Sequence, residues 1–264
     1  MKDEIHAAAK GALVGGILDD EIYDSEIIEA FGSTKQHRGE RSLDLPISSI
    51  VALRPSDFFR QGATWRSAAQ GLHCEGWDRC RDSIVRYFTS NLEDSLFPAP
   101  YSYQELRIGF TGGAVYCKLG NHRTAAAKAW LASHYGEEAI FKQANCYYRP
   151  VKYSLKPLME ECIDEGSTLK FFYYTTDRFG FKNKLLRKAG IQYLVLVEHA
   201  SSSCDLYILD SDSENLVPVS PGRNAVSRLL KIDFRSKCLR LDFKVVPVTL
   251  MKMMLDENPI WQDS

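Results

Sequence analysis

The stretch GGAVYCKLGNHRTAAAKAW (residues 112–130) constrains the fold of this chain more than any other segment. Its first half is apolar and aromatic up to Gly120, which is typical of a strand. Its second half is rich in alanine, the residue with the highest helix propensity. A strand therefore passes through a short turn directly into a helix. The turn carries two adjacent basic residues, His122 and Arg123, at the helix end where the dipole favours negative charge.

This turn has the features of an anion-binding site. The first turn of a helix leaves backbone N–H groups without partners inside the helix. Gly120 lets a ligand approach the backbone because it has no Cβ. Arg123 offers a planar fork that suits phosphate oxygens, and His122 adds a second donor. We predict a site for a nucleotide phosphate. The alternative is a structural turn with Asn121 as N-cap and both basic side chains in solvent.

The sequence LGNHRTAAAKAW resembles the signature of the ParB/sulfiredoxin superfamily, in which a Gly-x-His-Arg or Gly-x-Arg-Arg turn precedes an alanine-rich helix. The upstream segment LDLPISSIVALRPSDF is similar to the opening strand of that superfamily, which in sulfiredoxins ends in an Arg-Pro step. The resemblance covers residues 43–150. It implies an α+β fold with a ParB/sulfiredoxin-like N-terminal domain that binds ATP or CTP. The residues it implies for nucleotide binding are Arg54, Gly120, Asn121, His122, Arg123 and Thr124.

One position departs from the sulfiredoxin pattern. Sulfiredoxins carry their nucleophilic cysteine where this chain has Asn121, and a carboxamide cannot act as a thiolate. Reduction of sulfinic acids is therefore not expected. ParB partition proteins continue into a helical DNA-reading domain, whereas residues 166–250 have the pattern of strands. The remaining functions are hydrolysis of a nucleoside triphosphate, cleavage of nucleic acid and a small-molecule kinase. The alternative is a regulatory module that senses a nucleotide or binds DNA or protein without turnover.

Catalysis of these kinds requires a general base, a metal ion such as Mg²⁺, or both. We expect His122 and Arg123 to act at the phosphates. Glu93 follows a predicted helix and is the first candidate for the base or metal ligand. Asp94 and Glu40 are further candidates. Each carboxylate is, alternatively, an ordinary surface residue.

We predict three parts along the chain: an acidic helical extension (1–33), a ParB/sulfiredoxin-like domain (34–150) and a C-terminal α/β domain (151–264). The first contains two short helices separated near Gly15 and Gly16. The second contains a strand, a helical region, a β-hairpin and a closing strand, at residues 43–53, 64–91, 105–120 and 139–151. The third has the order α-β-α-β-β-α-β, with helices predicted at residues 154–166, 181–190 and 222–234.

Charge gives weaker indications of partners. The net charge of −1 does not indicate nucleic-acid binding by the whole molecule, so DNA contact would need a local basic patch. The best such patch includes Arg223, Arg228, Lys231 and Arg235, and a solvated face is the alternative. Binding of a protein partner is a further alternative. The acids Glu198, Asp205 and Asp210 lie near predicted strand ends, but their spacing does not match a restriction-type nuclease, so we expect structural roles for them.

Cysteine usage and hydropathy bear on the cellular compartment. Seven cysteines without a C-x-x-C pair predict reduced thiols in a cytoplasmic protein. His73, Cys74 and Cys80 make at most half a zinc site. The apolar stretch at residues 7–18 is too short to span a membrane and contains Lys10. We therefore expect a cytoplasmic location and no membrane partner.

Overall fold

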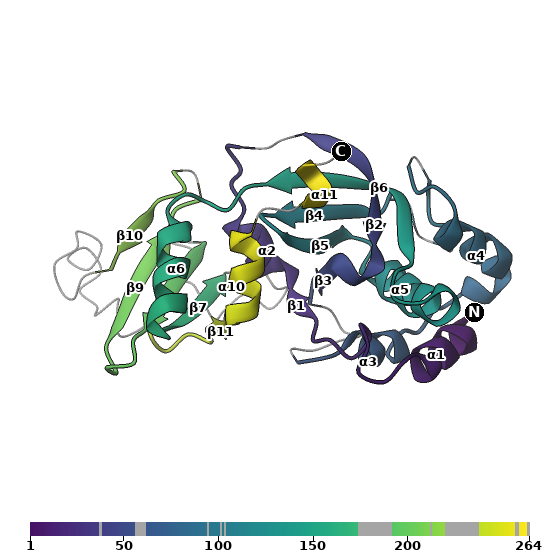
Figure 1. Ribbon diagram of the computed structural model, residues 1–264, viewed down its shortest axis with the longest axis horizontal. Helices are drawn as coiled ribbons and strands as arrows, with labels where there is room; N and C mark the ends of the chain where they lie inside the picture. The colour runs from purple at the N-terminus through teal and green to yellow at the C-terminus, as the bar shows by residue number, and fades with distance from the viewer. Residues whose placement is uncertain are drawn as a thin grey trace. The chain divides into compact units, whose positions relative to one another are not determined.

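A computed structural model describes residues 1–36, 39–55, 62–93, 95–100, 102, 104–173, 192–211, 213–219, 238–256 and 259–262 (Figure 1). Its contacts divide the chain into two compact units. One comprises Met1–Pro150 with Asp256–Ser264, and the other comprises Val151–Leu255. Helices and strands occur together in both units, which agrees with the predicted α+β class. Residues 1–33 belong to the first unit, and their helices bury apolar side chains such as Ile5, Ile28 and Phe31.

The first unit contains a six-stranded mixed sheet with the order β1-β3-β5-β4-β6-β2. Its strands are β1 (Tyr23–Asp24), β2 (Glu40–Pro46), β3 (Ile50–Leu53), β4 (Arg107–Thr111), β5 (Ala114–Leu119) and β6 (Ile140–Arg149). The β1–β3, β3–β5 and β4–β6 pairs are parallel, and the β4–β5 and β2–β6 pairs are antiparallel. The predicted hairpin is confirmed, because Thr111 pairs with Ala114 across the glycine turn.

The single strand predicted over residues 43–53 is wrong. The segment forms β2 and β3, separated by the short 3₁₀ helix η1 (Ile47–Ser49). The hydroxyl of Ser49 donates a 2.7 Å hydrogen bond to the carbonyl of Pro46, which closes the turn between them. As a result β3 pairs with β1 and β5, whereas β2 pairs with β6 at the far edge of the sheet.

The helices of the first unit are α1 (Lys2–Gly11), α2 (Ser25–Phe31), α3 (Trp65–Gln70), η2 (Trp77–Cys80), α4 (Arg81–Thr89), α5 (Asn121–Tyr135) and α11 (Pro259–Gln262). The helical region predicted over residues 64–91 is thus divided into α3, η2 and α4. Helix α3 begins with a capping box between Thr64 and Ser67 and ends at Gly71. The chain then turns through Gly76 at a φ of +76° before η2.

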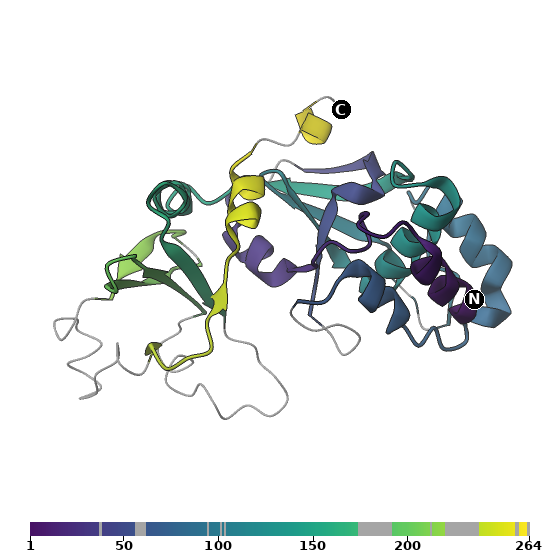
Figure 2. The same cartoon turned by 60° about the horizontal axis from the view of Figure 1, so that its bottom comes forward.

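Helices cover both faces of this sheet. Figures 1 and 2 show α1, α3 and α5 gathered together, and these three helices contact one another. Side chains alternate between faces along β5. Cys117 faces α5, where its sulfur lies 3.1 Å from the hydroxyl of Thr124. Lys118 points the other way and pairs with Glu29 of α2.

Helix α5 lies at the centre of the first unit, because every residue from Arg123 to Leu131 is buried. Its alanines are small enough for the sheet and neighbouring helices to pack closely. Lys128 is also buried at 1% exposure. Its Nζ donates a 2.8 Å hydrogen bond to the carbonyl of Ile50 and lies 4.0 Å from the centroid of the Trp65 ring. Burial lowers the pKa of Lys128 to about 7.

The end of the chain completes the core of the first unit. Trp261 of α11 is 3% exposed. Its ring stacks on Tyr148 at 5.5 Å between centroids and tilts against Phe110 at 5.7 Å. The guanidinium of Arg41 covers the same indole at 5.1 Å. The second unit is therefore inserted, in sequence, between two segments of the first.

The second unit contains a five-stranded sheet with the order β10-β9-β8-β7-β11. Its elements are α6 (Leu155–Glu165), β7 (Thr168–Tyr173), β8 (Tyr193–Glu198), β9 (Cys204–Leu209), β10 (Leu216–Pro218), β11 (Lys244–Val245) and α10 (Val248–Leu255). All pairings among these strands are antiparallel, so the described sheet lacks the parallel crossovers of an α/β domain. The helices predicted at residues 181–190 and 222–234 fall outside the described residues.

Candidate functional site

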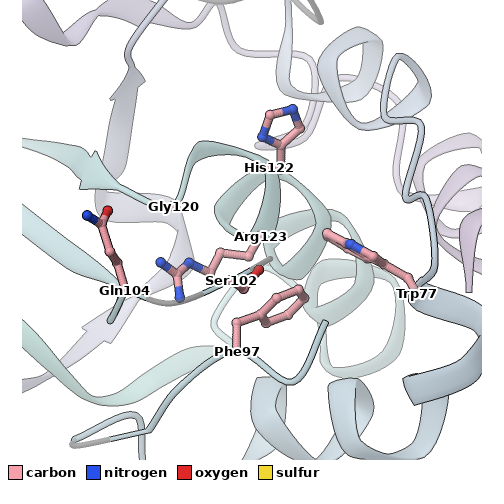
Figure 3. Close-up of a pocket in the computed structure, with 7 residues that line it drawn as sticks. All are labelled: Trp77, Phe97, Ser102, Gln104, Gly120, His122 and Arg123. Atoms are coloured by element: carbon pink, nitrogen blue, oxygen red, sulfur yellow. The ribbon is translucent and has the colours of Figure 1, made fainter. Parts of the chain in front are cut away.

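The N-terminal end of α5 forms one wall of a pocket of about 290 Å³ in the first unit. Figure 3 shows the residues that line it, which come from three parts of the chain. The turn and first residues of α5 contribute Gly120, His122 and Arg123. Helix η2 contributes Trp77, and the segment between α4 and β4 contributes Phe97, Ser102 and Gln104.

Gly120 makes room for the guanidinium of Arg123. Its φ of +105° lies in the region that favours glycine. A Cβ at this position would overlap Nε of Arg123 and lie 3.0 Å from both Cζ of Arg123 and a methyl group of Leu106. As the N-cap of α5, Gly120 has no side chain with which to cap the helix. The space beside Gly120 that we expected a ligand to use is therefore filled by the Arg123 side chain of the protein itself.

Arg123 is the main source of positive charge in the pocket wall. It is 7% exposed, and its Nη2 donates a 2.9 Å hydrogen bond to the carbonyl of Glu105. Its Nη1 is buried and has no acceptor among the described residues. Figure 3 shows the side chain extending from α5 toward Gln104, with Phe97 on one side. An unpaired N–H on a buried cation is costly, so an anionic oxygen from a ligand would stabilise this arrangement.

Tyr87 of α4 adds a second buried polar group to this region. Its hydroxyl lies beside the Arg123 guanidinium, although the two groups are not well aligned for a hydrogen bond. Burial raises the pKa of Tyr87, and the positive charge of Arg123, together with its hydrogen bonding to the hydroxyl, partly opposes that increase. Tyr87 also packs against Phe97 at 5.2 Å between ring centroids. The hydroxyl therefore stays protonated at neutral pH and remains a possible donor.

His122 lies on the other side of the helix start, and Figure 3 shows its ring directed away from Arg123. The residue is exposed overall, yet partial burial lowers the pKa of the imidazole. The nearby His73 lowers that pKa further. The imidazole is therefore mainly neutral at neutral pH, the form that can accept a proton.

Asn121 and Arg54 meet at the turn through the backbone of Arg54. Asn121 is the first helical residue, not the N-cap. Its Nδ2 donates a 3.0 Å hydrogen bond to the carbonyl of Arg54, and its Oδ1 accepts from the Arg54 amide at 3.4 Å. The Arg54 guanidinium instead pairs with Glu26 at 2.5 Å and is 67% exposed. The structure thus brings the Arg-Pro step to the turn, but the Arg54 side chain does not line the pocket.

Thr124 is fully buried, and its hydroxyl faces the protein interior. The hydroxyl lies 3.0 Å from the carbonyl of Gly120 and 3.1 Å from the sulfur of Cys117. Burial raises the pKa of the Cys117 thiol to about 12. Thr124 therefore stabilises the turn from the protein interior. Cys117 is a packing residue with no thiolate character.

The structure does not bring the candidate carboxylates to the pocket. Glu93 is exposed and Glu40 lies 3.8 Å from Arg107 at the start of β2, and neither lines the pocket. Asp94 falls outside the described residues. Nowhere in the described ranges do three His, Cys, Asp or Glu side chains gather as a metal site would require.

The predicted features outside this pocket have separate outcomes. The basic patch residues Arg223, Arg228, Lys231 and Arg235 lie outside the described residues. Glu198, Asp205 and Asp210 have three different partners, namely Lys170 at 2.7 Å, His199 at 3.0 Å and the amide of Ser213 at 3.0 Å. All seven cysteines are free thiols, which agrees with their prediction as reduced residues.

Sequence reasoning missed four lining residues: Trp77, Phe97, Ser102 and Gln104. Trp77 follows a glycine turn, and the other three lie in or beside the proline-containing segment LFPAPYSYQ. Loops often carry binding residues, so aromatic residues in such irregular segments were a signal for the pocket, although a weak one.

Comparison of the chain with protein-family models, curated proteins and solved structures found no match. The likeness to the ParB/sulfiredoxin signature therefore rests on the motif and on the order of elements around it. Among the described residues, no helix has the length and apolar character needed to cross a membrane.

Proposed function

We propose that the first unit is a ParB/sulfiredoxin-like domain that binds a nucleotide, with a phosphate in the pocket at the start of α5. The buried guanidinium of Arg123 carries this proposal, because its Nη1 has no well-aligned acceptor among the described residues. A phosphate oxygen would supply the missing acceptor, and the positive end of the α5 dipole would add to the attraction. Gln104 and Ser102 also line this pocket and add polar side chains to it. ATP and CTP are the first ligands to test.

The size and lining of the pocket fit this ligand class. Small-molecule pockets have volumes of roughly 300–1,000 Å³, and this one is about 290 Å³. It would hold a phosphate with one further group, while the rest of a nucleoside triphosphate would extend out of it. Trp77 and Phe97 provide an apolar surface beside the charged wall. This combination of one buried cation and aromatic rings favours an anion attached to a planar or apolar group.

Turnover is the second candidate function. Hydrolysis of the nucleotide or cleavage of nucleic acid would need a proton acceptor, and the neutral imidazole of His122 lines the pocket, although its ring is directed away from Arg123. Binding without turnover would make the first unit a nucleotide sensor. Release of phosphate from ATP or CTP, measured with and without Mg²⁺, separates these possibilities. An enzyme should lose most of its rate in His122→Ala while keeping its nucleotide affinity within a few fold.

The binding proposal is tested by titrating labelled ATP, CTP and GTP into the wild type and into charge variants. Arg123→Ala should weaken binding at least tenfold, because it removes a charged hydrogen-bond donor. Gln104→Glu adds a negative charge at an exposed position and should weaken binding about threefold to fivefold. The matched control Gln70→Glu makes the same change at an exposed position that does not line the pocket. Failure of all three nucleotides to bind the wild type would refute the proposal.

A further inference from the structure

The opposite end of α5 borders a second pocket in the first unit, with a volume of about 370 Å³. Its inner wall contains Phe88 of α4, Leu131 of α5 and Ala139. All three side chains are buried, at 1%, 2% and 8% exposure. The inner wall is therefore apolar and preformed.

The mouth of this pocket leaves large apolar side chains in solvent. Tyr135 is 62% exposed and Ile140 is 42% exposed. Both lie on the pocket lining, beside the buried wall. Burial of such apolar surface is the dominant favourable contribution to most association, so an apolar group seated here would gain from both the wall and the mouth.

Two opposite charges stand at the same mouth. Glu138 and Lys142 both line the pocket and are exposed. Within the described part of the chain, neither forms an ion pair. Lys142 and Ile140 share one face of β6, because side chains two residues apart on a strand point the same way. Tyr135 is the last residue of α5, so the partial negative charge at the C-terminal end of this helix lies beside the pocket.

We propose that this second pocket binds a free amino acid with an apolar side chain, such as leucine, methionine or phenylalanine. The side chain would occupy the wall formed by Phe88, Leu131 and Ala139. The carboxylate would pair with Lys142. The ammonium would pair with Glu138 at the negative end of α5, with the Tyr135 ring as a further partner for a cation. A zwitterion can pair with Lys142 and Glu138 at the same time. A simple carboxylic acid would pair with Lys142 but meet the like charge of Glu138, and a simple amine would meet the like charge of Lys142.

This inference does not depend on nucleotide binding at the other end of the helix, and its test keeps the two apart. L-leucine is titrated calorimetrically into the full chain at millimolar concentration, beside 4-methylpentanoate, which lacks the ammonium, and 3-methylbutylamine, which lacks the carboxylate. We expect saturable binding of leucine and about threefold to fivefold weaker binding of each analogue, which is the upper part of the range for exposed ion pairs. Arg123→Ala, if folded, should bind leucine as the wild type does.

Charge variants give a crossed pattern that a nonspecific apolar site would not show. Lys142→Gln should weaken leucine and 4-methylpentanoate about threefold and leave 3-methylbutylamine unchanged or tighter. Glu138→Gln should weaken leucine and the amine but not the acid. Lys10→Gln and Glu75→Gln make the same changes at exposed positions outside the pocket and should have no effect. Absence of leucine binding, or equal affinity of leucine and both analogues, would overturn the proposal.

Discussion

Replacing Gly120 with alanine should disrupt the first pocket through one specific collision. A residue with a side chain at positive φ costs about 1–2 kcal/mol. The new Cβ would also displace the Arg123 guanidinium, which would then lose its hydrogen bond to Glu105. Hydrogen bonds to charged groups contribute about 1.5–3 kcal/mol. We therefore expect Gly120→Ala to lower the free energy of unfolding by about 2.5–5 kcal/mol and to weaken nucleotide binding at least tenfold.

Gly15→Ala separates the two contributions. Gly15 has a φ of +78°, and a Cβ there would have no atom within 4 Å, so this variant should show only the backbone cost. All four tryptophans lie in the first unit, so urea unfolding followed by tryptophan fluorescence reports on that unit. The excess destabilisation in Gly120→Ala should be about 1.5–3 kcal/mol. Equal destabilisation by both variants would refute the assignment of Gly120 as the residue that positions Arg123.

Two further predictions concern the pH dependence of stability. Burial lowers the pKa of Lys128 to about 7, against about 10.4 in an unfolded chain. The unfolded state then binds more protons between these values, so wild type should gain stability relative to Lys128→Met as the pH rises from 7 to 10, measured by urea unfolding at each pH. Asp19 has its pKa lowered to about 2 by the hydrogen bond from Arg66. The stabilisation by the ionised Asp19 is therefore present above pH 4 and should be lost between pH 4 and 2. Over that range the melting temperature of Asp19→Asn should fall less than that of the wild type.

The sequence predicted the local parts of the fold well. The hairpin follows from adjacent strands and a Gly112–Gly113 turn, and α5 follows from its alanine content. Both are determined by residues close in sequence. The division of residues 43–53 into two strands was missed, because it depends on a turn at Pro46 and on partners as distant as β6. The boundaries of β2 and β3 therefore required tertiary contacts.

The part of the candidate site that was predictable is likewise formed by residues close together in sequence. Gly120, His122 and Arg123 lie in one turn of sequence and do line one pocket. The side chain of Arg54 was expected there too, but it pairs with Glu26, an acid about thirty residues earlier in the chain. Phe97 belongs to the pocket only because the segment after α4 folds against α5. Contacts of this kind depend on tertiary packing, which residue types and spacing do not specify.

The return of the chain end to the first unit has a consequence during synthesis. When a ribosome has made residues 1–150, all six strands of the first sheet exist, yet the space for Trp261 between Phe110 and Tyr148 has no occupant. The whole second unit must be translated before that indole arrives. At about 5–20 residues per second, the 111 residues from Val151 to Trp261 take roughly 6–22 seconds. During this interval Phe110 and Tyr148 lack the aromatic partner that they have in the folded first unit, so we expect this surface to be open to chaperone binding until α11 packs on it.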